Sequence, residues 1–256
     1  MLVQKVKNKL ISSKIDLVAE EQMELLKKEF QPLEIEMKNI RQMVKILLPG
    51  IDSMSNLEKI KQLRNLVYNQ VAIGNNAVPY KYSMDPDLFV RLYLKDNYTA
   101  LCGDIALVYH YMLMAYDIPS NIVGLFYNLT PPIDNHVSVQ VYSEEYGKFI
   151  ISDPSFNMFV VDSASGTPMN YIGFKNAIKN KKNYLYDYNG FDLVESRKVS
   201  SYYIDYWKLT NYIYVDLWLS WDGSFIYANG SKGNYLYEWR GMNHYSRDRV
   251  ALFEGR

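Results

Sequence analysis

The spacing of apolar residues predicts helices through the first part of the chain. Residues 1–48 carry apolar side chains at helical intervals between charged ones. Ser55 and Glu58 form a capping box ahead of a second helical pattern. Asp85-Pro86 supplies the cap and the first-turn proline that start a third helix. We expect these helices to pack against the body of the protein.

The middle of the chain predicts a buried helix followed by an antiparallel hairpin. Residues 104–116 are largely apolar, and Asp117-Ile118-Pro119 ends that helix, because the residue before a proline disfavours helical geometry. Residues 122–127 predict a strand. Residues 136–142 alternate with period two, and residues 148–153 form the returning strand of a hairpin.

The C-terminal part of the chain predicts a short helix and further strands. A turn at 162–168 leads into a polar helix near 171–181, and strands follow at 213–219, 225–227 and 234–239. Asn229-Gly230 and Lys232-Gly233 are the expected turns between the last strands. The tail either extends the sheet of the hairpin or forms a small β-subdomain.

Together these elements predict an α+β fold, in which N-terminal helices pack on an antiparallel sheet that has a β-rich C-terminal extension. The expected organisation is a helical segment over residues 1–50, a core over 51–185, and an extension of the same domain over 186–256. A chain of 256 residues is long enough to bury a sizeable core in this arrangement.

Charge and composition exclude some classes of function. The 28 Lys and Arg balance 28 Asp and Glu, and this zero net charge argues against binding nucleic acid through its phosphates. No apolar run approaches the ~20 residues that span a bilayer, so we expect no transmembrane segment. No signal-peptide pattern is present, which slightly favours the cytoplasm, although removal of a signal would leave the same sequence. The oligomeric state is open.

The position of the one cysteine suggests chemistry. Cys102 lies at the start of the buried helix, where orphan N–H groups create a partial positive charge that favours the thiolate. Gly103 leaves room for a substrate backbone beside the sulfur. Asp104 works against the thiolate through its own charge, and it is also a candidate cap for the helix. A single cysteine is commonly a small buried apolar residue, so Cys102 alone does not decide the function.

A histidine and an aspartate follow at the open end of the predicted hairpin. With a loop centred between Glu144 and Glu145, His136 lies directly opposite Asp153, within hydrogen-bonding range. A loop centred two residues later instead places Asn157 opposite His136. A thiol, an imidazole and a carboxylate are the groups of a cysteine acyl-transfer site, in which the imidazole takes the thiol proton and the carboxylate orients the imidazole.

Further polar residues have candidate or structural roles. Asn97 and Tyr98, in the loop before Cys102, are candidates to join the Cys102 backbone N–H in an oxyanion hole. His110 lies in the middle of a helix and is interpreted as structural, and His244 lies in a polar tail segment that requires no role for it. No CxxC, HExxH or glycine-rich phosphate motif occurs, so we expect neither a metal nor a cofactor.

Three blocks of this sequence resemble the transglutaminase-like superfamily in its bacterial form. Leu-Cys-Gly-Asp-Ile-Ala (101–106), heading an apolar helix that ends in Asp-Ile-Pro, is similar to the nucleophile helix of that family. Asn-His-Val-Ser-Val-Gln-Val-Tyr (135–142) and Lys-Phe-Ile-Ile-Ser-Asp-Pro-Ser-Phe-Asn (148–157) resemble its His and Asp strands. The turn Gly166-Thr167-Pro168 and the helix after it are similar to bacterial members. The resemblance covers roughly residues 55–180.

The resemblance implies a papain-like α+β core with a catalytic triad of Cys102, His136 and Asp153. It implies acyl transfer from an amide of a peptide, a protein or another substrate, as in a peptidase, an amidase or a transglutaminase-type enzyme. The alternative is a catalytically silent scaffold of the same fold that serves as a protein- or glycan-binding module, with the N-terminal helices and the Tyr-rich tail as its surfaces.

The sequence also departs from many relatives. Val137 and Ser138 follow the histidine where relatives have Ala and Trp, so the wall of the substrate site differs. Phe149 replaces a Trp that precedes the apolar run of the aspartate strand. No calcium-ligand cluster precedes Asp134, so the calcium activation of animal transglutaminases is not implied.

Overall fold

The computed structural model describes residues 34–78, 85–96, 98–126, 135–189, 212–216, 224–226, 232–234 and 250–254. The chain divides into two compact units, Met1–Ile35 and Glu36–Arg256, and the sheet and the candidate site belong to the second. The described helices are α2 (Glu34–Leu47), the 3-10 helix η2 (Ile51–Ser53), α3 (Asn56–Gln70), α4 (Pro86–Lys95), α5 (Cys102–Ala115) and α6 (Tyr171–Lys179). The described strands are β1 (Ala72–Ile73), β2 (Thr99–Ala100), β3 (Ser120–Phe126), β4 (Asn135–Ser143), β5 (Lys148–Asp153), β6 (Met158–Asp162), β7 (Tyr184–Asp187), β8 (Tyr212–Asp216), β9 (Ser224–Ile226), β10 (Lys232–Asn234) and β11 (Val250–Glu254).

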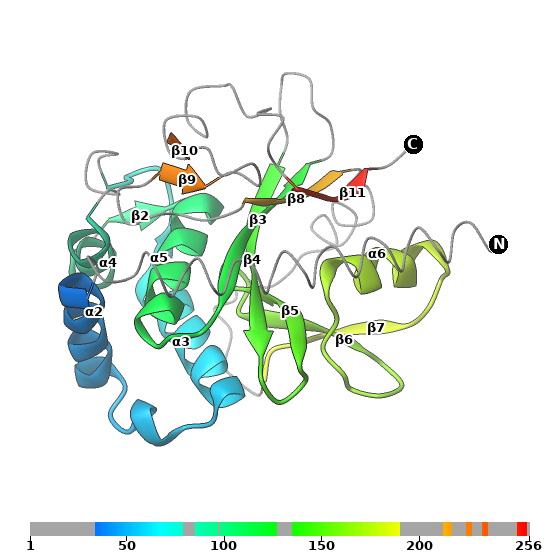
Figure 1. Ribbon diagram of the computed structural model, residues 1–256, viewed down its shortest axis with the longest axis horizontal. Helices are drawn as coiled ribbons and strands as arrows, with labels where there is room; N and C mark the ends of the chain where they lie inside the picture. The colour runs from blue at the N-terminus through cyan, green and yellow to red at the C-terminus, as the bar shows by residue number, and fades with distance from the viewer. Residues whose placement is uncertain are drawn as a thin grey trace. The chain divides into compact units, whose positions relative to one another are not determined.

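Seven of these strands form one antiparallel sheet in the order β11-β8-β3-β4-β5-β6-β7 (Figure 1). β8 pairs with β3 and β11 pairs with β8, so both strands extend the sheet that contains the predicted hairpin. β9 and β10 form a separate two-stranded sheet, and β1 pairs with β2 in parallel. The predicted α+β class, with helices beside an antiparallel sheet, is confirmed.

Helix α5 packs against β3 and β4, and α3 and α4 pack on α5 (Figure 1). Every residue from Gly103 to Ala115 is buried, which explains the nearly uninterrupted apolar sequence of this helix. α3 and α4 start where the sequence predicts. The Ser55 hydroxyl accepts the Glu58 N–H at 3.3 Å, and the Asp85 carboxylate accepts the Leu88 N–H at 2.9 Å.

The face of the sheet that carries the β4 valines is packed on α5. Val137, Val139 and Val141 are fully buried on this face. Ser152, which pairs with Val139 across the hairpin, hydrogen-bonds through its hydroxyl to the Tyr109 hydroxyl of α5 at 2.9 Å. Part of the core therefore lies between α5 and this face. In the ranges that the structure describes, no helix has the length and apolarity to cross a bilayer.

The hairpin loop is centred one residue later than the sequence suggested. Val139 pairs with Ser152, and continuing this ladder places Asp153 opposite Ser138 rather than opposite His136. The loop spans four residues and ends at Gly147, whose φ of 61° lies in the left-handed region that glycine adopts readily. The predicted direct opposition of His136 and Asp153 is therefore wrong.

His136 and Asp153 nevertheless share one face of the sheet, because side chains alternate along a strand and the register moved Asp153 by an even number of positions. They are diagonal neighbours, and long side chains bridge that separation. The alternative register, which opposed His136 to Asn157, is wrong as well. The conformation of the loop at residues 144–147, rather than the alternation of residues along the strands, selects the observed register.

The structure differs from the sequence prediction at two further places, a strand that was not predicted and a predicted turn that is a strand. β6 was not expected, because its sequence Met-Phe-Val-Val is a continuous apolar run that shows no alternation, and all four of these residues are buried. The predicted turn at Lys232-Gly233 is wrong, since both residues lie in β10 and pair with β9. The predicted helix before Glu34, the Asn229-Gly230 turn and the predicted strand beyond Asn234 lie outside the described residues.

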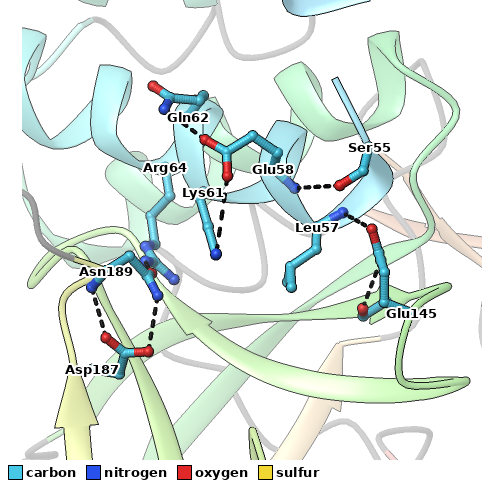
Figure 2. Close-up of polar contacts among 10 residues, drawn as sticks. Ser55, Leu57, Glu58, Lys61, Gln62, Arg64, Glu145, Asp187 and Asn189 are labelled. Atoms are coloured by element: carbon cyan, nitrogen blue, oxygen red, sulfur yellow. Dashed lines mark hydrogen bonds and ion pairs between the residues drawn. The ribbon is translucent and has the colours of Figure 1, made fainter. Parts of the chain in front are cut away.

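The hairpin turn is hydrogen-bonded to the N-terminus of α3. The Glu145 carboxylate accepts the Leu57 N–H at 2.7 Å (Figure 2), and its other oxygen accepts the Ser143 hydroxyl at 3.1 Å. A carboxylate in this place is favoured by the helix dipole. Burial opposes its ionisation, but the N–H groups of Leu57 and Glu145 and the hydroxyls of Ser55 and Ser143 outweigh burial and lower the pKa of Glu145.

We expect Glu145→Gln to lower the free energy of unfolding by about 0.5 kcal/mol at neutral pH, the usual size for an exposed carboxylate at a helix N-terminus. The folded-state pKa lies below the unfolded-state value of about 4.3, so this stabilisation is complete above the unfolded value and is lost as the pH falls through the folded one. Urea unfolding of both proteins from neutral to acidic pH measures the difference.

Glu144→Gln is the matched control, because it removes an equal charge from the same turn. The Glu144 side chain is exposed, and it is the backbone N–H of this residue that bonds to Asn56, at 3.1 Å. The control should lower the free energy of unfolding at neutral pH by less than Glu145→Gln does, because it leaves the bond from Leu57 to Glu145 in place. Equal losses from the two substitutions would show that the Glu145 contact contributes nothing of its own.

Candidate active site

Cys102 occupies the first position of α5. Leu101 caps the helix in an extended conformation and offers no side-chain acceptor to the first N–H groups. These N–H groups give the helix end a partial positive charge beside the sulfur. The residue as a whole is partly exposed. Cys102 is therefore accessible, in a position where the helix stabilises a thiolate.

A short, buried hydrogen bond joins His136 to Asp153. His136 Nε2 donates to Asp153 Oδ2 at 2.7 Å, and the Asp153 side chain has no exposed surface. The Ser155 backbone N–H donates to Asp153 Oδ1 at 2.9 Å. Both carboxylate oxygens therefore accept a hydrogen bond, which fixes the orientation of the carboxylate and, through it, that of the imidazole.

The His136 imidazole also lies near enough to the Cys102 thiol to influence its titration, by hydrogen bonding and by charge. Since Nε2 is bonded to Asp153, proton exchange with the thiol falls to Nδ1. Burial opposes the charge on Cys102, but the hydrogen bond and charge of His136 and the Val137 N–H outweigh burial and lower the Cys102 pKa. Burial likewise opposes the imidazolium, but Asp153 and the thiolate raise the His136 pKa above its ordinary value. The pair thus favours a thiolate beside an imidazolium.

Phe156 covers the imidazole. Its ring centroid lies 5.6 Å from that of His136, with an angle of 54° between the planes. It sits in the turn that joins β5 to β6, three residues after Asp153. An aromatic ring in this place limits the motion of the imidazole and excludes water from one side of it. The sequence offered only the proximity of Phe156 to the aspartate as a signal for this contact.

Arg64 is a second residue that the sequence reasoning missed. It lies on α3, and its side chain is fully buried beneath the strands that carry the site. A signal was present, since Arg64 follows the buried Ile60 by four residues and so falls on the apolar stripe of the helix. A charged residue on such a stripe indicates either a polar interior contact or a functional role.

Of the two oxyanion-hole candidates, the structure describes Tyr98 alone. Asn97 lies outside the described residues. Tyr98 is partly buried, and its ring packs edge-on against Tyr93 with centroids 6.5 Å apart. This contact does not place the Tyr98 hydroxyl at the thiol, so its role stays a prediction. The N–H groups at the start of α5, including that of Cys102, are the donors that the helix geometry itself supplies.

Neither of the two remaining histidines is assigned to the candidate site. His110 Nδ1 hydrogen-bonds to the Ser120 hydroxyl at 2.8 Å, and burial lowers the pKa of His110 to about 4. This agrees with its interpretation as a structural residue. His244 lies outside the described residues. Among the residues that the structure describes, no group of three or more His, Cys, Asp and Glu side chains is arranged to hold a metal ion.

The structure thus brings Cys102, His136 and Asp153 together from a helix and two neighbouring strands. Comparison of the chain with models of protein families, with curated proteins and with solved structures gave no match. The chemistry of these three side chains therefore has to be inferred from their geometry and their surroundings.

We expect Asp153→Asn to lower the pKa of His136, because an amide preserves the shape of the carboxylate but removes the charge that stabilises the imidazolium. A pH titration of the histidine ring resonances by NMR measures this. His110 serves as the internal reference, since it lies in a separate contact with Ser120 and should keep its low midpoint. An unchanged His136 midpoint in the variant would show that Asp153 does not support the charged imidazole.

Proposed function

We propose that this chain is a cysteine-dependent acyl-transfer enzyme that acts on amide bonds. Cys102 is the nucleophile, His136 the general base and acid, and Asp153 the residue that orients the imidazole. The observation that carries the proposal is a partly exposed cysteine residue beside an imidazole that is hydrogen-bonded to a fully buried carboxylate. Perturbed titration of a thiol and an imidazole at one partly exposed position favours a functional site over a structural cysteine.

The chemistry follows from these three groups. The Cys102 thiolate attacks the carbonyl carbon of an amide, forming a C–S bond and an oxyanion that the N–H groups at the start of α5 stabilise. Collapse of this intermediate breaks the C–N bond, and the His136 imidazolium gives its proton to the leaving amine. Water or a second amine, losing a proton to His136, then attacks the thioester carbon and releases the thiolate. Water gives hydrolysis, and an amine gives transfer.

The arrangement of elements supports a papain-like, transglutaminase-like core. The nucleophile begins a buried helix that packs on an antiparallel sheet, and the base and the carboxylate lie on adjacent strands of that sheet. The three groups occur in the order Cys, His, Asp along the chain. The substrate class that fits this chemistry is an amide of a peptide, a protein or a smaller acyl donor.

The experiment is to incubate the purified protein with glutamine-containing peptides and other amides in the presence of hydroxylamine, which converts acyl-enzymes to hydroxamates. We expect hydroxamate from the parent protein and, without hydroxylamine, an acyl adduct on Cys102 by intact mass. Cys102→Ala should give neither. His136→Ala should reduce the rate by roughly 100-fold or more, because it removes the general base.

Ser120→Ala provides the matched control, since it removes a buried hydrogen bond elsewhere in the core and should retain full activity. A folded parent protein that binds peptides or glycans but forms neither adduct nor hydroxamate across the panel would instead match the silent binding module.

A further inference from the structure

Arg64 is a buried cation behind the candidate site. Its side chain has no exposed surface, and its guanidinium carbon lies 3.9 Å from the centroid of the Phe159 ring. Burial lowers the pKa of Arg64 to about 10, against the opposing electrostatic influence of Tyr109, Asp187 and Asp153. Arg64 is therefore charged at neutral pH. A charge is costly to bury, so specific contacts have to compensate it.

These contacts bind both ends of the turn that follows Asp153. Arg64 Nη1 donates to Ser152 Oγ at 3.3 Å, and Nε donates to Asn157 Oδ1 at 3.1 Å. Asn157 has a φ of 51°, in the left-handed region that is unfavourable for most residues other than glycine. Its Nδ2 donates to Asn65 Oδ1 at 2.9 Å. Both ends of the Asn157 amide are thus held from α3.

The same turn carries the contacts that orient the catalytic pair. The Ser155 N–H donates to Asp153, and the Phe156 ring lies against His136. A displacement of the turn would therefore move the carboxylate and the covering ring together. By holding Asn157, Arg64 therefore restrains both the bond from Ser155 to Asp153 and the ring contact of Phe156 with His136.

Arg64 approaches Asp153 from the opposite face of the sheet. It binds Ser152 and stacks on Phe159, which is the partner of Ser152 on β6. Asp153 is the next residue along β5, so its side chain points to the other face. The guanidinium and the carboxylate attract each other across the end of the strand.

The third contact of the guanidinium goes to a neutral group. Nη2 donates to Asn189 Oδ1, and Asn189 donates through its backbone N–H and its Nδ2 to the Asp187 carboxylate at 2.8 and 3.0 Å (Figure 2). The Asp187 charge is therefore one amide away from the guanidinium. Since these three hydrogen bonds go to neutral oxygens, the positive charge of Arg64 is balanced through space by two carboxylates, Asp187 with the larger influence and Asp153 with the smaller one.

We propose that Arg64 is a positioning residue for the Asp153–His136 pair, which holds the 153–157 turn in place and sets a positive charge behind the carboxylate. The proposal rests on the function proposed above. Among the described residues, the charged groups that act on the Cys102 thiol are His136 from β4 and Asp153 from β5. Asp104 lies in the same first turn of α5 as Cys102. Displacing Asp153 weakens the imidazolium, and the thiol then titrates at higher pH.

The test is the rate of Cys102 alkylation by iodoacetamide as a function of pH. In Arg64→Met the midpoint should move toward the ordinary thiol value of about 8.5, and the rate near pH 6 should fall at least about tenfold. Arg64→Lys keeps the charge without the planar fork and should recover part of the loss. Asn157→Gly permits the left-handed backbone but removes the link to Arg64, so it should reproduce the Arg64→Met shift.

The double variant and a control separate positioning from general destabilisation. Arg64→Met combined with Asn157→Gly should shift the midpoint no further than either change alone, because both break one connection. Ser120→Ala removes a buried hydrogen bond away from the turn and should keep the parent midpoint. Where the parent thiol titrates below the ordinary range, a parent-like midpoint in folded Arg64→Met overturns the proposal. If Arg64→Met does not fold, a parent-like midpoint in Asn157→Gly overturns it.

A second readout distinguishes this proposal from the proposed function. The His136 Nε2 proton, in its bond to Asp153, should give a downfield NMR resonance that shifts or disappears in Arg64→Met and in Asn157→Gly. If the parent thiol titrates in the ordinary range but this resonance depends on Arg64, the positioning role holds and the acyl-transfer function fails. If the parent thiol titrates below the ordinary range but both substitutions leave the resonance unchanged, the function holds and the role of Arg64 fails.

Discussion

The hydrogen bond from His136 to Asp153 is the interaction on which the rest of the site depends. A carboxylate without exposed surface is tolerated only where neighbouring groups compensate its charge, and here the imidazolium and the Ser155 N–H do so. The charged imidazole in turn lowers the pKa of Cys102 against the effect of burial. Burial by itself favours the neutral forms of the thiol and the imidazole, so this bond opposes the effect of burial. The hairpin and the 153–157 turn hold His136 Nε2 at 2.7 Å from Asp153 Oδ2.

Local signals in the sequence predicted the elements wherever a cap coincided with a periodic pattern. α3 follows Ser55 and α4 follows Asp85, as their caps indicated. The continuous burial of β6 erased the alternation that would have identified it as a strand. The pairing of β8 with β3 joins segments far apart in the chain, and no local pattern encodes such a contact. The class of fold was therefore predictable, whereas the strand order was not.

For the site, the sequence predicted the residue types and their order but not their geometry. The hairpin register depends on Gly147 and its left-handed backbone, which the alternation of apolar residues does not report. His136 and Asp153 still meet because the observed register, like the predicted one, places both side chains on the same face of the sheet. Arg64 and Phe156 were missed because their contacts come from tertiary structure, although the position of Arg64 on an apolar stripe was a usable sign. The oxyanion role of Asn97 and Tyr98 stays a prediction.

Near neutral pH, Cys102 should exist as a thiolate beside a protonated His136. The ultraviolet absorbance of the thiolate measures this directly, as a pH titration of the parent protein against Cys102→Ala, and the single cysteine makes the difference spectrum specific. We expect thiolate absorbance well below the ordinary thiol pKa of about 8.5, and its displacement toward that value in His136→Ala. Absorbance that develops only near 8.5 in the parent protein, and that is the same in His136→Ala, would contradict the assignment of this site.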